Sequence, residues 1–297
     1  MQRRFVTVDV FTDKIFCGNP LAVVLDAEDL DDVAMQAIAR EFNYSETTFV
    51  LPPTDPAHTA HVRIFTPLKE LPFAGHPNVG TAYVLAREGG AFGKPLGERL
   101  LFEEGAGLVP VDILSEGGTI VGARLTAPRA AEVGRTFTAG YAAVCVGLDA
   151  ADIVTASHEP VLASAGLPFP VIQLTGLEAL RRAKPDVRAL AREPDMMGHV
   201  YLYARSAEDP RTLHARMFAP GVGVHEDPAT GSAAAALTGL LAGLEGADGT
   251  FEYYISQGVE MGRPSLMATS ADVAGGLVTG VRVGGRCATV MRGEITA

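Results

Sequence analysis

The sequence predicts an α+β protein with two similar domains, each a sheet wrapped around one largely apolar helix. Three observations predict this fold class. The length of 297 residues suits two domains of ordinary size. Segments with strand-like alternation are interspersed with segments of helical spacing. Finally, four short motifs occur twice in the same order, which indicates an internal duplication.

The duplication relates the two halves of the chain at a nearly constant spacing. In chain order the matched segments are Gly18–Val24 with Gly166–Ile172, Ala37–Glu41 with Ala189–Glu193, Arg63–Pro67 with Arg216–Pro220, and Pro77–Ala82 with Pro228–Ala233. We therefore expect an N-terminal domain over 1–128, completed by a last strand at about 280–297, and a C-terminal domain over 129–280.

The first half of the sequence predicts strands and helices in alternation. Phe5–Val10 alternates apolar and polar residues as a half-buried strand does, and Leu30–Phe42 has helical spacing. Thr48–Leu51 and His61–Phe65 again have the composition of strands. Pro77 is expected in the first turn of a second helix that continues to Arg87, since a missing N–H does no harm there.

The second half repeats this pattern. Val171–Leu174 is a predicted strand, and Asp186–Arg192 a predicted helix. Val200–Ala204 and His214–Phe218 are further predicted strands. The motif at Pro228 then opens an Ala-rich helix, whose small residues allow strands to approach it closely.

The composition narrows the classes of function. The formal net charge is −11 and the basic residues form no cluster, so we expect no binding to nucleic acid. The first residues lack a signal-peptide pattern, and the longest weakly polar stretch, Ala233–Leu244, is too short to cross a bilayer. Three widely spaced cysteines suit a reducing compartment. We therefore expect a cytoplasmic protein with no membrane partner.

Two of the repeated motifs have the pattern Pro-x-x-Gly-[Ser/Thr]-Ala at the start of an apolar helix. The first N–H groups of a helix lack internal partners and carry partial positive charge. Gly80 and Gly231 would let a ligand approach the backbone, and Thr81 and Ser232 add hydroxyl groups. We expect both helix N-termini to face a cleft between the halves and to bind an anion there, most simply a carboxylate.

Each of these helices is preceded by a different titratable residue, His76 in the first half and Asp227 in the second. A duplicate that has diverged at this one place indicates two chemical roles in one site.

Comparison of the halves adds two more candidates. At the repeat offset of 152 residues, Glu46 falls on Gly198, so its carboxylate has no counterpart in the second half. Asn19 falls in the same way on Leu167. Polar residues kept in only one half of a symmetric scaffold suit an asymmetric substrate.

Several motifs occur in a characteristic order from Val6 to Val290. They are Asp9-Val10-Phe11-Thr12, Gly18-Asn19-Pro20, Ser45-Glu46-Thr47, Gly75-His76-Pro77, Glu226 to Ala233, Gln257-Gly258 and Gly262-Arg263-Pro264-Ser265. Together they resemble the motifs of the phenazine-biosynthesis PhzF-like family. The resemblance implies the duplicated diaminopimelate epimerase-like fold, in which each half is a curved, mainly antiparallel sheet around a central helix. It also implies a site in the cleft between the halves, and a homodimer.

The resemblance further implies an activity. The family's characterised enzyme isomerises trans-2,3-dihydro-3-hydroxyanthranilate by moving a proton between ring carbons, with no metal or organic cofactor. By this resemblance Glu46 is the catalytic acid and base, while His76 and Asp227 hold and polarise the substrate. The expected substrate contacts are Asn19, Gly75, Asn78 (where many members have Thr), Gly80, Thr81, Gly231 and Ser232.

The expected chemistry agrees with these roles. Transfer of a proton between carbons needs one group that accepts the proton and returns it, with a pKa raised toward neutrality. Burial of Glu46 between Tyr44 and Phe49 would raise its pKa in this direction. The predicted function is therefore cofactor-independent isomerisation of a small, cyclic, unsaturated carboxylic acid.

Two other functions remain open at this point. A protein with the same fold could bind a small acid without turnover. An epimerase or racemase of this fold would use two cysteines, one near each central helix, but Cys17, Cys145 and Cys287 all lie outside the two helix motifs. The sequence has no convincing metal-ligand set, P-loop or dinucleotide fingerprint, so we expect neither a metal nor a cofactor.

Overall fold

A computed structural model of the chain describes residues 1–192, 196 and 198–297. The fold is mixed and rich in strands, with few helices. The chain divides into two compact units: unit 1 is Met1–Thr126 with Gly284–Ala297, and unit 2 is Ala127–Val283.

Unit 1 consists of strands around one long helix. Its strands are β1 (Gln2–Val10), β2 (Asn19–Val24), β3 (Glu46–Leu51), β4 (Ala60–Phe65), β5 (Glu70–Leu71), β6 (Arg99–Glu104), β7 (Gly107–Glu116), β8 (Thr119–Thr126) and the later part of β17 (Leu277–Thr296). Most neighbours pair antiparallel, including β1 with β2 and β17, and β3 with β4. The exceptions are β2 with β3 and β4 with β6, which run parallel.

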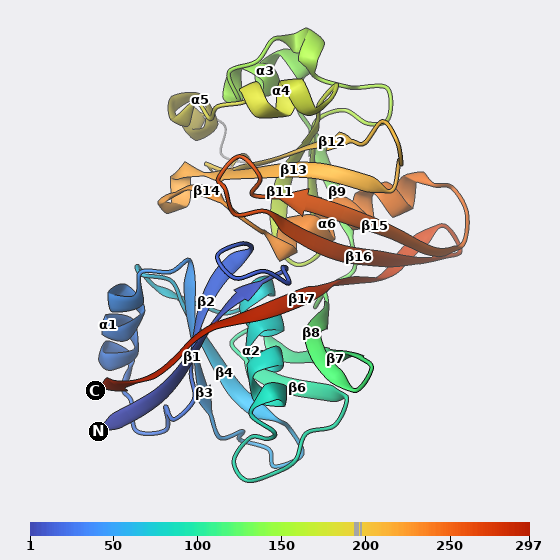
Figure 1. Cartoon of the computed structure of the whole chain (residues 1–297). Helices are drawn as coiled ribbons and strands as arrows, with labels where there is room; N and C mark the ends of the chain where they lie inside the picture. Colours follow the sequence, from blue (N-terminus) through green and yellow to red (C-terminus); the bar gives the residue numbers. More distant parts are fainter. Residues whose placement is uncertain (193–195, 197) are drawn as a thin grey trace. The chain divides into compact units, whose positions relative to one another are not determined.

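The two helices of unit 1 cover different faces of the strands. Helix α2 (Gly75–Arg87) is buried at every residue from Gly75 to Leu85, and Figure 1 shows it surrounded by the strands of this unit. Helix α1 (Asp32–Phe42) lies outside, where Met35 and Ala39 pack against Phe49 and Phe65. A helix that is apolar all round is stable only when it is enclosed on all sides, as α2 is.

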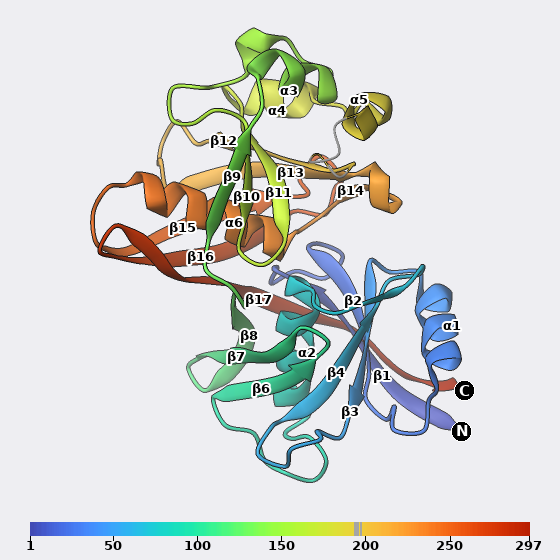
Figure 2. The ribbon, with the colours of Figure 1, turned by 180° about the vertical axis from the view of Figure 1, so that it is seen from behind.

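Unit 2 has the same order of strand pairing. Its elements are β9 (Glu132–Thr136), α3 (Ala139–Cys145), β10 (Val161–Ser164), β11 (Pro168–Gln173), α4 (Leu177–Arg182), α5 (Val187–Arg192), β12 (Val200–Arg205), β13 (Thr212–Ala219), β14 (Val224–Asp227), α6 (Gly231–Leu244), β15 (Gly249–Gln257), β16 (Ser265–Ala274) and the start of β17. As in unit 1, two pairs are parallel, β11 with β12 and β13 with β15. Figure 2 shows α3, α4 and α5 on one face of these strands and α6 on the other.

Most predicted elements are confirmed, including a second helix that has Pro77 in its first turn and ends at Arg87. Two details of the motif helices differ from the expectation: Gly80 and Thr81 do not lie in the first turn, and the second motif helix begins after Pro228. Helix α2 begins at Gly75 after its N-cap Ala74, so Pro77 is its third residue and Gly80 and Thr81 lie in the second turn. Helix α6 begins at Gly231, after its N-cap Thr230, so Pro228 precedes the helix. Pro is tolerated anywhere in a first turn, and its position therefore locates a helix start only approximately. Of the repeated segments, Glu193 lies outside the described residues.

The structure uses Gly80 and Thr81 for packing. A Cβ atom on Gly80 would lie 2.5 Å from Leu21 Cδ2 and 2.8 Å from Val10 Cγ2. The fully buried Thr81 hydroxyl is 2.8 Å from the hydroxyl of Thr48 on β3. The second turn of α2 therefore contacts the strands directly, and we do not retain Gly80 and Thr81 as substrate contacts.

No helix within the described residues is both long and apolar enough to cross a membrane.

Replacement of Gly80 by Ala should destabilise unit 1 because the added methyl group overlaps two core side chains. We expect a loss of about 1–3 kcal/mol in the free energy of unfolding, measured by urea denaturation. The matched control is Gly140→Ala in α3, where an added Cβ meets no atom within 4 Å. That variant should keep or slightly gain stability. Equal stability of the two variants would contradict the packing assignment.

Candidate active site

Three of the predicted site residues, Asn19, Glu46 and His76, lie together in unit 1. Asn19 is the first residue of β2 and Glu46 the first of β3. Because these strands are parallel, with Leu21 opposite Glu46, they begin at the same edge of the sheet. His76 is the second residue of α2, whose N-terminus reaches this edge.

The turn before Asn19 requires a glycine. Gly18 has a φ of +62°, and a Cβ on it would lie 2.3 Å from the carbonyl oxygen of Val10. The Asp9 carboxylate accepts a hydrogen bond of 2.6 Å from the Phe16 N–H within the same loop. These local constraints explain why the Gly-Asn-Pro sequence can deliver the Asn19 amide to the end of a buried strand.

The imidazole of His76 lies between an amide and a carboxylate. Its Nδ1 is 3.3 Å from Asn19 Nδ2, and its Nε2 is 3.3 Å from Glu46 Oε2. Asn19 is fully buried, and the side chains of His76 and Glu46 are 6% and 16% exposed. The Glu46 side chain is therefore the most exposed of the three, although its Oε2, which faces His76, is shielded from solvent.

Burial keeps His76 neutral. Loss of hydration lowers the pKa of His76 to about 3, although a hydrogen bond with the backbone of Pro20 opposes this effect. A neutral imidazole has one N–H donor and one acceptor nitrogen. Proline has no N–H, so the Pro20 carbonyl accepts from the single N–H of the ring, and this N–H must be shared with Pro20 or leave it before it donates to Glu46 or to an oxygen of a bound molecule.

Asp227 belongs to a second polar group, in unit 2, that is tightly hydrogen-bonded. Its carboxylate accepts a bond of 2.5 Å from the Thr230 hydroxyl. The Gln257 amide donates to the Asp227 carbonyl at 2.8 Å and to the Thr230 hydroxyl at 3.0 Å. The Tyr201 hydroxyl in turn donates to Gln257 Oε1 at 3.1 Å. This network fixes the loop that leads from β14 into α6.

The loop between β14 and α6 is also held by a close contact between two backbone segments. Ser265 donates to the carbonyl oxygens of Pro228 and Gln257 at 3.0 and 3.1 Å. Gly258 has a φ of +76°, and a Cβ there would lie 2.6 Å from the Pro228 oxygen. Only glycine permits this approach of the two backbones.

The first turn of α6 can bind an anion. The N–H of Ala234 is bonded to the Thr230 carbonyl at 2.9 Å, so it closes the first helical turn. The N–H groups of Gly231, Ser232 and Ala233 precede it and have no partner within the helix. With the dipole of a 14-residue helix behind them, these groups suit a carboxylate or another small anion.

The predicted residues thus form two groups, each within one unit. The Asn78 amide donates to the Ala74 carbonyl at 2.9 Å, which ties the start of α2 together. Sequence reasoning missed the roles of Tyr201, Thr230 and Gln257 around Asp227. Thr230 and Gln257 stand in the quoted motifs and could have been found there, whereas Tyr201 carries no local signal. Within the described residues, no three His, Cys, Asp or Glu side chains are grouped so as to hold a metal ion.

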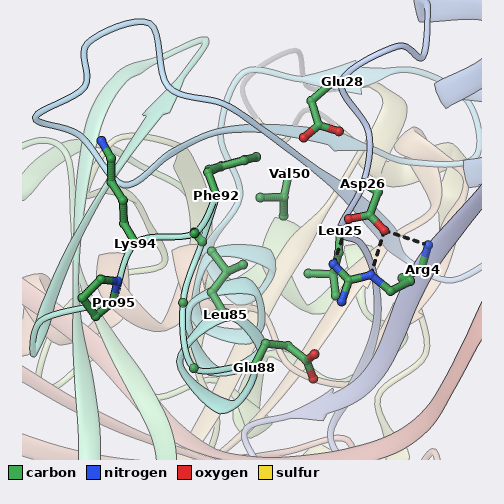
Figure 3. A pocket seen from close by; sticks show the side chains of 14 residues that line it. Arg4, Leu25, Asp26, Glu28, Val50, Leu85, Glu88, Phe92, Lys94 and Pro95 are labelled. Carbon is green, nitrogen blue, oxygen red and sulfur yellow. Dashed lines mark hydrogen bonds and ion pairs between the residues drawn. The ribbon is translucent and has the colours of Figure 1, made fainter.

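A cavity of about 610 Å³ in unit 1 lies apart from this cluster. Figure 3 shows it lined by Leu85 and Glu88 from the C-terminal end of α2, by Lys94, and by Arg4 paired with Asp26. A helix rises 1.5 Å per residue, so Glu88 is about 18 Å along the axis from the position of His76. This pocket therefore contributes nothing to the polar cluster.

Comparisons with known proteins agree on one family. The family model described as "Phenazine biosynthesis-like protein" matches residues 8–293. An uncharacterised isomerase of Mesorhizobium japonicum is 39% identical, over 99% of this chain and 98% of its own length. The trans-2,3-dihydro-3-hydroxyanthranilate isomerase of Pseudomonas aeruginosa is 38% identical, over 98% of each chain. The crystal structure of a PhzF-family phenazine biosynthesis protein of Bacillus anthracis matches with a TM-score of 0.87 at 23% identity, over 100% of both chains.

The depressed pKa of His76 predicts a loss of stability in acid. The folded-state pKa of about 3 lies below the ordinary value of 6.5, so the unfolded state binds more protons between these pH values. The free energy of unfolding should therefore fall as the pH drops from 6.5 toward 3, by about 2 kcal/mol between pH 7 and pH 5 from this group alone.

Urea denaturation of the wild type and of His76→Gln at pH 7 and pH 5 tests this predicted loss of stability in acid. The variant should lose less stability between the two pH values than the wild type does. His225→Gln, at an exposed position, should follow the wild type. If the wild type and His76→Gln had the same pH dependence, the imidazole of His76 would be protonated as easily in the folded protein as in the unfolded chain.

Proposed function

The chain belongs to the phenazine biosynthesis-like PhzF family and is an isomerase, and we propose that it moves a proton between carbon atoms of a small carboxylic acid. The family match spans residues 8–293, and relatives up to 39% identical over the whole chain are named isomerases. The proposed substrate is a cyclic, unsaturated acid of the dihydro-hydroxyanthranilate type. Three relatives at 37–38% identity carry the name of that activity.

The contact between Glu46 and His76 is the observation that carries the proposal. Proton transfer between carbons needs a base that can return the proton as an acid, and a partly buried carboxylate beside a neutral imidazole can do this. Glu46 takes the proton from the substrate carbon and delivers it to the other carbon. His76 donates a hydrogen bond to the substrate or to Glu46, and Asn19 orients the imidazole ring.

Groups of unit 2 are proposed to anchor the same substrate. The substrate carboxylate would accept hydrogen bonds from the first N–H groups of α6 and from the Ser232 hydroxyl. Asp227, held by Thr230 and Gln257, would accept from a hydroxyl or amino group of the substrate. That both groups of residues serve one substrate stays a prediction, and the Asp227 variant below tests it.

Gly75 is proposed as a backbone contact because it begins α2 beside His76. The homodimer implied by the family resemblance also stays a prediction, which light scattering would test. The shared order of strand pairing supports, as a further part of the proposal, a duplicated origin of the two units.

The alternatives rest on weaker observations. An epimerase with two thiols is disfavoured because Cys145 and Cys287 are buried in the core, and burial raises the pKa of Cys287 to about 12. A binding protein without turnover would need no Glu46 carboxylate in contact with a neutral imidazole. The cluster therefore favours an enzyme.

Replacement of Glu46 by Gln should abolish isomerisation, because an amide cannot accept the proton. We expect kcat with trans-2,3-dihydro-3-hydroxyanthranilate to fall by about 10²–10⁴-fold, as is typical for loss of a general base. Turnover followed by absorbance measures this, with circular dichroism to show that the variant is folded.

The chain offers a matched control for this variant. Glu103 also contacts a histidine, with its Oε1 2.7 Å from His58 Nδ1, and its side chain is also 16% exposed. Glu103→Gln should keep wild-type kcat. Retained activity in Glu46→Gln, or an equal loss in both variants, would refute the assignment of Glu46.

Replacement of Asp227 by Ala should weaken substrate binding more than it slows the chemistry. A hydrogen bond to a charged group contributes about 1.5–3 kcal/mol, so KM should rise about 10- to 150-fold. Steady-state kinetics of Asp227→Ala and of the milder Asp227→Asn give both parameters. A wild-type KM in both variants would show that unit 2 does not hold the substrate through this residue.

A further inference from the structure

An Arg-x-Phe motif that occurs once in each half takes no part in the proposed mechanism. Arg63 and Phe65 lie on β4, and Arg216 and Phe218 lie on β13. In both units the guanidinium covers the ring of the phenylalanine two residues on. Its central carbon is 5.1 Å from the ring centroid in unit 1 and 4.6 Å in unit 2. The two arginines therefore occupy equivalent places in the two units.

Each arginine binds a carboxylate on the next strand along the chain through two parallel hydrogen bonds. In unit 2, Nε and Nη2 of Arg216 donate to the two carboxylate oxygens of Glu226 at 2.8 and 2.9 Å. In unit 1, the same nitrogens of Arg63 donate to Glu70, both at 2.7 Å. Glu226 lies on β14 and Glu70 on β5, the short strands that lead into α6 and α2. Because a bidentate pair restricts both distance and orientation, each arginine fixes the approach to a motif helix.

The third guanidinium nitrogen joins an outer helix to the same pair. Nη1 of Arg216 donates to the carbonyl oxygens of Leu180 and Ala183, both at 3.0 Å, at the C-terminal end of α4. The last carbonyls of a helix lack partners within it, so these bonds satisfy two of them. In unit 1, Nη1 of Arg63 donates to Asp32, the first residue of α1, at 2.7 Å. Each arginine thus ties together two strands and one outer helix.

Only in unit 2 does the bound carboxylate adjoin a predicted site residue. Glu226 is followed directly by Asp227, whereas Glu70 lies six positions before His76. Successive side chains of a strand point to opposite faces. Figure 2 shows α4 and α6 on opposite faces of the unit 2 strands. Glu226 is held on the α4 side, so Asp227 points to the α6 side, where it meets Thr230, the N-cap residue of that helix.

The pair in unit 2 is also the more deeply buried one. The side chains of Arg216 and Glu226 are 9% and 11% exposed, against 18% and 43% for Arg63 and Glu70. A buried ion pair adds little stability compared with apolar residues of similar size, because both charges lose their hydration. Its geometry, in contrast, is strongly restricted. These properties suit a pair that specifies where a strand lies.

We propose that Arg216 and Glu226 are positioning residues that hold Asp227 where it contacts the substrate. The ion pair fixes β14 from the α4 side, while Thr230 and Gln257 hold Asp227 from the α6 side. The inference rests on the proposed function for its effect on kinetics. The position of Asp227 itself can be followed without a substrate.

Steady-state kinetics of Glu226→Gln test the effect on binding. The glutamine keeps the shape of the side chain but has one acceptor oxygen and no charge, so one of the two parallel bonds is lost. We expect KM to rise about 3- to 10-fold, as for residues coupled in one network, with kcat within about twofold of the wild type. Glu70→Gln removes the equivalent bond in unit 1 and should keep the wild-type KM. An equal rise of KM in both variants would overturn the proposal.

A double variant separates positioning of Asp227 from a general loss of structure. In the background of Asp227→Ala, the further change Glu226→Gln should raise KM no more, because the residue that the pair positions is gone. Urea denaturation shows that each variant is folded under the assay conditions. A second, independent rise of KM in the double variant would mean that Glu226 does not act through Asp227.

Nitrogen-15 NMR of glutamine-labelled protein follows the position of Asp227 directly. The side-chain amide of Gln257 donates to the Asp227 carbonyl at 2.8 Å, and its signals are assigned by their loss in Gln257→Ala. These signals should shift in Arg216→Lys, since lysine keeps the charge but cannot form the two parallel bonds. They should stay unchanged in Arg63→Lys.

Unchanged Gln257 signals in Arg216→Lys would overturn the proposal. If the wild type does not turn over trans-2,3-dihydro-3-hydroxyanthranilate, that result counts against the proposed function, and the NMR comparison still decides whether the ion pair positions Asp227.

Discussion

The burial of α2 along almost its whole length is the constraint on which unit 1 depends. A buried helix must satisfy the polar groups of its first turn without water. The strands around α2 supply partners there, since Asn19 and Glu46 lie beside His76 at the N-terminal end. Farther along the helix, the Thr81 hydroxyl meets that of Thr48, and the Tyr83 hydroxyl accepts from Thr289 at 3.4 Å. The polar end of an otherwise apolar helix is thus where reactive groups can be both buried and held in place.

The polar residues of the two units differ in how tightly hydrogen bonds hold them. In unit 2, Asp227 is held in a dense network with Thr230, Gln257 and Tyr201, which suits a group that must bind without moving. In unit 1, the contacts of His76 with the Asn19 and Glu46 side chains are both 3.3 Å, and the Glu46 side chain retains some access to solvent. Longer contacts leave a proton-transfer group free to change partners during a reaction cycle. This contrast supports the proposed roles, in which Asp227 binds the substrate and Glu46 transfers the proton.

The sequence predicted the helices and strands well and the roles of single residues unevenly. Periodicity located α1 within two residues of its start, because helix and strand patterns are local properties. The start of α6 was misplaced, at Pro228 instead of Gly231, because a proline shortly before a helix and one in its first turn give the same sequence pattern. The repeat offset matched Glu46 to Gly198, whereas the strand registers, Val23 with Thr48 and Val171 with Tyr201, match it to His199.

The central claim is that Glu46 carries a proton between substrate carbons within this buried cluster. The most direct measurement is incorporation of solvent deuterium into carbon-bound positions of trans-2,3-dihydro-3-hydroxyanthranilate and its product, followed by mass spectrometry in heavy water. We expect one deuterium at the carbon that receives the proton. The fraction of product that carries it depends on how fast the proton on Glu46 exchanges with solvent, which the partly exposed side chain allows. It also predicts no incorporation with Glu46→Gln. Incorporation that persists at the wild-type rate in Glu46→Gln would contradict the account.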